Sequence, residues 1–268
     1  MKKTFLLSCL MLAAMPVMAA YTGHVYVDKN KNGVFDQSEK PLAGIKVSDG
    51  LNVVETAADG SFTLPGHERE RFIFITTPSG YKTFNRHYHK IEKKQSGYDF
   101  GLIPYSGRIR KNGSHRYIHI ADTEIFNTEN HADWVNNVRD YARNEQAAFI
   151  IHTGDICYEK GLKAHIKLMN TENMDCPVFY CIGNHDLVKG KYGEELFESI
   201  YGPVYYSFDA GNVHYVVTPM PGGDHAPGYT SDDVCRWLKN DLAHIRPGTP
   251  VVVFNHDLLT YEDAFIFK

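Results

Sequence analysis

Positive charge is in short supply in this chain of 268 residues. Lys and Arg together number 28, against 32 for Asp and Glu, which gives a formal net charge of −4. Proteins that bind nucleic acid through bulk electrostatics need a basic face, so this balance argues against a nucleic-acid partner. It does not exclude a phosphorylated substrate, because bound metal ions can supply the positive charge that such a substrate requires.

Long apolar runs are absent after the first twenty residues, so the rest of the sequence offers no membrane span. A Gly-x-Ser-x-Gly sequence is also absent, which argues against a serine hydrolase of the α/β-hydrolase type. Cysteine is scarce, and a chain of this size can form a core without disulfides. We therefore expect buried free thiols, and no nucleophile, from the four cysteines beyond residue 20, which are Cys157, Cys176, Cys181 and Cys235.

The first twenty residues have the pattern of a targeting segment. Lys2 and Lys3 precede an apolar run over residues 5–17, and Ala19 and Ala20 provide small side chains for cleavage. The run is too short to cross a bilayer, so we interpret residues 1–20 as a cleaved signal peptide, with a short core helix as the alternative. The protein is accordingly expected to be exported, either periplasmic or secreted.

The region over residues 21–103 consists of short apolar stretches separated by turn residues. Asp49-Gly50, Asp59-Gly60 and Pro65-Gly66 interrupt the pattern at short intervals, and no long helical period is present. Short strands of this spacing predict a small all-β sandwich domain. The expected strands cover residues 22–27, 45–47, 52–56, 61–64 and 71–76.

After a linker at 104–113, buried strands alternate with amphipathic helices. This order predicts an α/β domain over residues 114–268. The expected strands cover residues 117–121, 149–153, 178–182, 213–218 and 250–255, and the expected helices cover 129–143, 160–171, 194–201 and 232–245.

Polar side chains follow four of these predicted strands, at the point where each strand ends. They include Asp122 and Glu124, then Asp155, then Asn184 with His185, and finally His256. In open α/β sheets, ligands bind outside the carboxyl ends of the strands, so we expect one shared crevice. Carboxylates close together repel one another unless cations lie between them, and this mixed oxygen and nitrogen set suits Mn, Fe or Zn.

Each of these features has an ordinary structural alternative when it is taken alone. Asp122 could cap a helix, Gly154-Asp155 could form an Asx turn, and His256 could be a satisfied core histidine. The ordered combination, with each member placed after a buried strand, favours a pair of divalent metal ions bridged by one carboxylate. Such a pair of metal ions stabilises both the attacking and the leaving oxygen during in-line displacement at phosphorus.

The order Asp122-x-Glu124, Gly154-Asp155, Gly183-Asn184-His185-Asp186 and His256 resembles the calcineurin-like metallophosphoesterase superfamily. The preceding region is similar to the β-sandwich domain of exported bacterial phosphoesterases, through Val47-Ser48-Asp49-Gly50 and Pro78-Ser79-Gly80-Tyr81. The resemblance implies that the α/β domain is a two-sheet α/β sandwich.

The resemblance also implies a role for each matching residue. Asp122 would bind the first metal, Asp155 would bridge both, and Asn184 and His256 would bind the second. A metal-bridging hydroxide would be the nucleophile, with His185 as general acid or electrostatic stabiliser. The implied substrate is a phosphate mono- or diester on a small molecule, a glycan or a lipid.

Two departures from the family pattern affect the expected site. Glu124 stands where the family usually has His; it either ligates as an oxygen donor or points away. The family's later Gly-His-x-His motif is missing, and the chain ends soon after the apolar residues 264–267. We therefore expect a truncated catalytic domain with at most three protein ligands per metal. The alternative function is an inactive phosphoesterase that acts as an exported binding or interaction protein.

A second constellation lies in the β-rich region, over residues 28–39. Its spacing fits the twelve-position calcium loop, with Gly33 at the sixth position and an acid at the twelfth. It is similar to the calcium loops in β-rich domains of bacterial surface adhesins, and a polar surface turn is the alternative. The expected calcium ligands are Asp28, Asn30, Asn32, Val34, Asp36 and Glu39.

Overall fold

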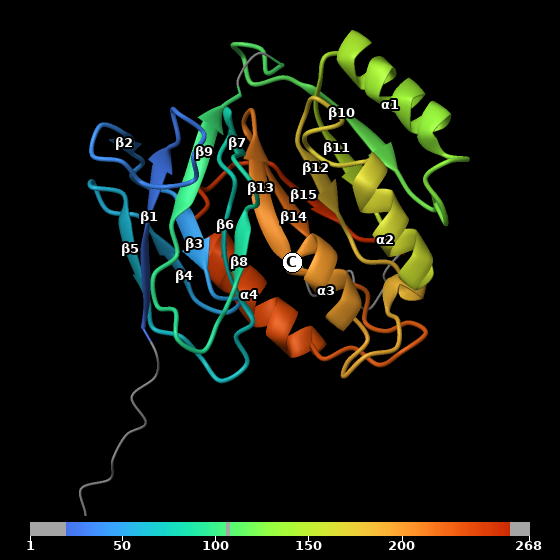
Figure 1. The fold of residues 1–268 in the computed structure, drawn as a ribbon. Helices are drawn as coiled ribbons and strands as arrows, with labels where there is room; N and C mark the ends of the chain where they lie inside the picture. The colour runs from blue at the N-terminus through green and yellow to red at the C-terminus, as the bar shows by residue number, and fades with distance from the viewer. Residues whose placement is uncertain (1–19, 106–107, 258–268) are drawn as a thin grey trace, which may run out of the picture.

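The computed structural model describes residues 20–105 and 108–257 (Figure 1). The expected signal peptide, apart from Ala20, and the apolar residues 264–267 lie outside the described ranges. Within those ranges, no helix combines the length and the apolar character needed to cross a membrane.

The N-terminal region is built from two sheets packed face to face. The first sheet has the order β2-β1-β9-β7, and β5 pairs with the first half of β1. The second sheet is antiparallel with the order β4-β3-β6-β8. The strands are β1 (Tyr21–Val27), β2 (Lys40–Pro41), β3 (Lys46–Ser48), β4 (Val53–Glu55), β5 (Ser61–Leu64), β6 (Phe72–Ile75), β7 (Tyr81–Thr83), β8 (Tyr88–Lys90) and β9 (Phe100–Pro104).

The C-terminal region contains two three-stranded sheets with four α-helices. One sheet is fully parallel and has the order β10-β11-β12; in the other, β13 and β14 form a hairpin and β15 runs parallel to β14. The elements are β10 (Arg116–Ile120), α1 (Ala132–Asn144), β11 (Ala147–His152), α2 (Tyr158–Leu168), β12 (Val178–Tyr180), the 3₁₀ turn η1 (Asn184–Asp186), α3 (Glu195–Tyr201), β13 (Tyr206–Ala210), β14 (Val213–Val217), α4 (Ser231–Ala243) and β15 (Val251–Phe254).

The central strand β11 shows how these layers stack. All six of its residues are buried, and successive side chains point to opposite faces of the sheet. Ile150 packs with the helices α1–α3, whereas Phe149 and Ile151 face the second sheet. Phe179 of β12 stacks on Phe208 of β13 with ring centroids 3.7 Å apart, which joins the two sheets. The predicted two-sheet α/β sandwich is confirmed.

Strand β6 explains how the N-terminal region attaches to the rest. Ile73 and Ile75 lie in the core of the N-terminal sandwich, whereas Phe72 and Phe74 on the other face pack against the C-terminal region. Phe74 meets the fully buried Trp237 of α4 with ring centroids 6.2 Å apart. In Figure 1, the strands β13–β15 accordingly lie between the N-terminal sheets and the strands β10–β12.

Ion pairs add to this apolar contact between the two regions. Arg71 donates to the buried carboxylates of Glu194 (2.9 Å) and Glu198 (3.2 Å). Arg69 pairs with Asp233 of α4 at 2.9 Å. Each pair joins a residue of the N-terminal sandwich to one of the C-terminal region, so the two regions are held by charge as well as by aromatic packing.

The predicted elements match the observed ones closely in the C-terminal region. All four expected helices are present, and each end lies within three residues of its predicted position. The strands β2, β7, β8, β9 and β13 were not predicted. The division at 104–113 between two domains stays a prediction.

Candidate metal centre

The carboxyl ends of the parallel strands lie at one edge of the molecule because their registers are aligned. Ile120 of β10 pairs with His152 of β11, and His152 pairs with Tyr180 of β12. The loops that leave these strands therefore begin at the same level. This alignment brings Asp122, Asp155 and Asn184 to one place from separate parts of the sequence.

Two glycines allow the loops after β11 and β12 to touch backbone to backbone. A Cβ atom on Gly183 would lie 2.2 Å from both the backbone nitrogen and Oδ1 of Asp155. A Cβ atom on Gly154, which has φ +100°, would lie 2.6 Å from the nitrogen of Gly183 and 3.0 Å from Nδ1 of His256. Any side chain here would push the candidate ligands apart, so the glycines are required by the close approach.

The orientation of His256 is fixed by a backbone hydrogen bond. Its Nδ1 lies 2.8 Å from the carbonyl oxygen of Thr153, which can only accept, so Nδ1 carries the proton. In the neutral form of the ring, Nε2 then carries the lone pair, and it faces Oδ2 of Asp155 at 3.4 Å. Two acceptors that face each other repel unless a cation lies between them. A histidine whose other nitrogen donates to a carbonyl is the usual arrangement of a metal ligand.

Asp122 completes a group of three metal-ligating side chains. One ligand atom each from Asp122, Asp155 and His256 lie within 4.8 Å of one another. Asp155 is buried, His256 is half-buried and Asp122 is exposed, so the group is open to solvent on one side. Two carboxylates and an imidazole suit Zn, Fe or Mn, and the residues present therefore fit a metal ion.

Backbone strain is concentrated at this group. Among the described residues other than glycine, eight have positive φ; four of those lie in the loops after β10 and β11, and a fifth is the first residue of α2. Such conformations cost of order 1–3 kcal/mol each and cluster at functional sites. The five are Asp122 (φ 53°), Glu124 (45°), Asp155 (53°), Cys157 (72°) and Tyr158 (56°).

The two remaining ligand predictions are neither supported nor excluded by these contacts. Asn184 is half-buried and follows Gly183 at the start of η1, so it borders the group. Glu124 is exposed and its carboxylate is not a member of the group. Ligation by Asn184 and by Glu124 stays a prediction.

His185 stands beside the group but is held by a different partner. Its Nδ1 lies 2.9 Å from Oδ2 of Asp224, and its backbone N–H donates to Oδ1 of Asp155 at 3.1 Å. The hydrogen bond to Asp224 raises the pKa of His185. Tyr158 lies next to the imidazole, with ring centroids 5.4 Å apart. His185 is therefore a half-buried side chain next to the candidate ligands, and its role as general acid stays a prediction.

Asp186 and Asp224 are two contributors that sequence reasoning did not identify. Asp186 is fully buried and accepts the backbone N–H groups of Cys157 (2.8 Å) and Gly183 (2.9 Å), which ties the two ligand loops together. Burial raises the pKa of Asp186. The Gly-Asn-His-Asp motif contains Asp186, so this motif could have identified it. Asp224 lies in a Gly- and Pro-rich loop whose sequence has no periodic hydrophobic pattern.

A buried polar chain supports the loop that carries Asp122. Nδ1 of His152 accepts the N–H of Gly154 at 3.1 Å, so its Nε2 carries the proton and donates to Oγ1 of Thr123 at 2.8 Å. The Thr123 hydroxyl in turn faces Nδ1 of His165 at 3.4 Å. Burial lowers the pKa of His152 well below its usual value and that of His165 to about 3, so both rings are neutral.

Cys157 lies close to the ligands but does not have the properties of a nucleophile. Its side chain is buried, and burial together with the charge of Asp155 raises the pKa of the thiol to about 12. A thiol with such a pKa stays protonated near neutral pH and is inert.

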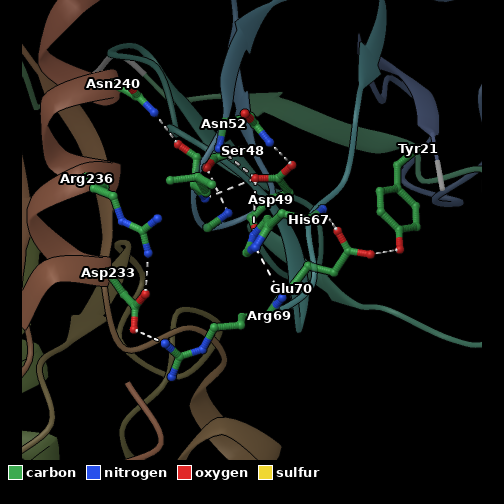
Figure 2. Close-up of polar contacts among 12 residues, drawn as sticks. Tyr21, Ser48, Asp49, Asn52, His67, Arg69, Glu70, Asp233, Arg236 and Asn240 are labelled. Atoms are coloured by element: carbon green, nitrogen blue, oxygen red, sulfur yellow. Dashed lines mark hydrogen bonds and ion pairs between the residues drawn. The ribbon is translucent and has the colours of Figure 1, made fainter. Parts of the chain in front are cut away.

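A second group of metal-ligating side chains lies in the N-terminal sandwich. Asp49, His67 and Glu70 also offer atoms within 4.8 Å of one another. Figure 2 shows that these atoms already have partners: Oδ1 of Asp49 accepts the N–H groups of Leu51 and Asn52, and Glu70 accepts from Tyr21 and from the N–H of His67.

The neighbours of that second group indicate a structural role. Nδ1 of His67 accepts the N–H of Arg69 at 3.3 Å, so the proton is on Nε2, which donates to the carbonyl oxygen of Asp49 at 3.1 Å. Arg69 reaches across to Asp233 of α4 (Figure 2). We interpret this network as part of the contact between the two regions.

Two family models match the chain. The model for calcineurin-like phosphoesterase matches residues 115–264. The model for the N-terminal part of calcineurin-like phosphoesterase matches residues 29–104. No curated protein matches this chain.

Proposed function

This chain belongs to the calcineurin-like phosphoesterase family, and on that basis we propose that it is an exported, metal-dependent hydrolase of phosphate esters. The observation that carries the proposal is the geometry of His256 and Asp155. A lone pair and a carboxylate that face each other at 3.4 Å, with Asp122 beside them, form a site built for a cation.

Two divalent ions would be held by the residues at the strand ends. Asp122 and Asp155 would hold the first, with Glu124 as an additional oxygen donor, and Asp155, Asn184 and His256 would hold the second. When bound, such ions polarise phosphoryl oxygens and lower the pKa of water. The exposed side of the group, at Asp122, leaves room for a phosphate ester to approach.

His185 would supply the proton that the leaving group needs. With Nδ1 engaged by Asp224, its Nε2 is the nitrogen available to the substrate. The raised pKa of His185 keeps more of the imidazole protonated near neutral pH. A positioned general acid typically contributes 10²–10⁴-fold.

The proposed substrate is a phosphorylated small molecule, glycan or lipid outside the cytoplasm. Export rests on the signal-like pattern of residues 1–20. Metals would provide the positive charge for the phosphate, because the chain itself is acidic overall.

Metal analysis followed by ester assays tests this proposal. Purified protein should contain divalent metal, and it should hydrolyse chromogenic phosphate mono- or diesters when Mn²⁺ is added. Folded protein that takes up no metal and cleaves neither ester would contradict the proposal and would favour the alternative role of an exported binding protein.

A further inference from the structure

The loop over residues 28–39 is closed at its base by strand pairing. Val27 at the end of β1 pairs with Lys40 at the start of β2. The first and twelfth residues of the loop, Asp28 and Glu39, are therefore neighbours, and both are buried, with 1% and 7% of their surface exposed. Burial of two carboxylates at one point is costly unless a cation or other partners compensate.

The carboxylates of Asp28 and Glu39 accept hydrogen bonds from backbone N–H groups of the loop itself. Asp28 accepts the N–H groups of Asn32 (3.2 Å) and Gly33 (2.9 Å). Glu39 accepts those of Lys29 (2.8 Å) and Asp36 (3.2 Å).

At the centre of the loop, side-chain amides occupy one carboxylate oxygen. Oδ2 of Asp36 receives an amide N–H from Asn30 at 2.7 Å and another from Asn32 at 3.0 Å. The Asp36 carboxylate is therefore bound by neutral N–H groups, at a point where a cation would interact with it more strongly.

No Lys or Arg side chain compensates these acids within the described part of the chain. The ion pairs found there do not involve Asp28, Asp36 or Glu39. Three carboxylates on one short loop, two of them buried, therefore lack a cationic partner, which is the situation that a metal ion resolves.

A buried hydroxyl beside Asp28 is a second, independent observation that points to a ligand at this loop. Tyr26 is fully buried and its hydroxyl has no hydrogen-bond partner among the described residues. A Cβ atom on Gly101 would lie 3.0 Å from Oδ2 of Asp28 and 3.2 Å from this hydroxyl, so the two oxygens share a space that glycine leaves open.

We propose that residues 28–39 bind one Ca²⁺ ion. The ligands would be the side chains of Asp28, Asn30, Asn32, Asp36 and Glu39 with the carbonyl oxygen of Val34. The set contains oxygen donors alone, which suits a hard cation, and neither histidine nor thiolate, which a transition metal would favour. The ion displaces the two amide N–H groups from Asp36, and its hydration water offers the Tyr26 hydroxyl a partner.

The site has a structural consequence for the contact between the two regions. Gly33 lies against the ring of Phe84, because a Cβ atom added to Gly33 would lie 3.3 Å from Cε1 of that ring. Gly33, Phe84 and Gly101 line a cavity of about 620 Å³ whose other wall is formed by β12 and the end of α2. Calcium would therefore order one wall of a cavity between the N-terminal and C-terminal regions.

Calorimetric titration of Ca²⁺ into the full chain tests the site. The comparison is between Glu39→Gln and the matched control Glu92→Gln, an exposed acid of the same sandwich. Both are made in an Asp155→Asn background, so that Ca²⁺ at the candidate metal centre does not contribute. We expect one site with a Kd of about 10⁻⁴–10⁻³ M in the control, and at least a tenfold weaker Kd in Glu39→Gln.

A second variant, Asp36→Asn, keeps the test decisive if Glu39→Gln does not fold. It should also lose at least tenfold in Ca²⁺ affinity, and Mg²⁺ should bind more weakly than Ca²⁺ to the control. Equal Ca²⁺ binding in the loop variants and the control, or no binding to any of them at about 10 mM Ca²⁺, well above the expected Kd, would overturn the proposal. Phosphoesterase activity plays no part in these outcomes.

Discussion

At the scale of single residues, the centre depends on which nitrogen of His256 carries a proton. The hydrogen bond to the carbonyl oxygen of Thr153 places the proton on Nδ1 and leaves Nε2 for a metal. His185 is held in the same way, but by Asp224 rather than by a backbone group. These two contacts are the basis for the proposed roles of His256 as a metal ligand and His185 as a proton donor.

His185→Ala should reduce turnover without removing metal. Loss of a general acid costs about 10²–10⁴-fold on esters with poor leaving groups, and less on nitrophenyl esters, whose leaving group needs little protonation. Steady-state kinetics on both ester types, with metal content measured in parallel, checks this. Equal losses on the two ester types would reject the role of proton donor.

Gly183→Ala should weaken metal binding by about 10–100-fold, the usual cost of disturbing the groups that orient ligands. The added Cβ would lie 2.2 Å from Asp155, so the ligand loop must move. Gly222→Ala is the matched control, because nothing lies within 4 Å of its added Cβ. Metal affinities measured by titration should differ between the two variants; the same affinity in both would show that Asp155 is not positioned by this contact.

At the scale of secondary-structure elements, β11 and α2 carry buried histidines that stabilise the fold only in the neutral state. The pKa of His165 in α2 is lowered to about 3 by burial, whereas the unfolded chain has the ordinary value near 6.5. Between these values the unfolded state binds a proton that the folded state does not. Stability is therefore fully present above pH 6.5 and is lost as the pH falls.

His165→Gln removes this titration and should flatten the pH dependence of stability. The wild type should lose about 2 kcal/mol between pH 7 and pH 5 on account of His165 alone, and the variant should be spared that loss. Chemical denaturation at the two pH values measures the difference. Parallel pH dependence in the two proteins would show that His165 is not a buried neutral group.

Elements with a clear hydrophobic period were predictable from the sequence, whereas β13 was not. The helices and the buried strands β11 and β14 follow their hydrophobic patterns. In β13, by contrast, the buried Ser207 bonds with Thr76 at 2.8 Å, and Asp209 pairs with Lys46 at 3.3 Å. Both partners belong to the N-terminal sandwich. The polar residues in β13 are therefore explained by the contact between the two regions, which the local sequence does not reveal.

The same distinction applies to the candidate site. Asp155 and Asn184 follow the buried strands β11 and β12, and His256 follows β15, two of whose four residues are exposed, so a position after a strand was the signal for these candidates. Asp224 acts through a hydrogen bond to a residue 39 positions away, from a loop without a regular pattern. No local feature of the sequence marks such a partner.

At the scale of the whole molecule, one arginine compensates two buried acids across the contact between the regions. Arg71→Met would leave Glu194 and Glu198 without a cation, which costs about 3–5 kcal/mol for a buried pair. Arg116→Met is the control, because its pair with Glu145 is exposed and should contribute about 0–1 kcal/mol. Denaturation midpoints check both values; similar small losses would mean that the two regions do not depend on Arg71.

The central claim is that the strand ends form a metal centre bridged by Asp155, and metal content measures it most directly. Wild-type protein should retain divalent metal after gel filtration, as should the control Asp232→Asn, an exposed acid at the start of α4. Asp155→Asn should lose metal and ester hydrolysis together while it stays folded, because Asp155 would contact both ions. Full metal content and near-normal turnover in Asp155→Asn would contradict the account.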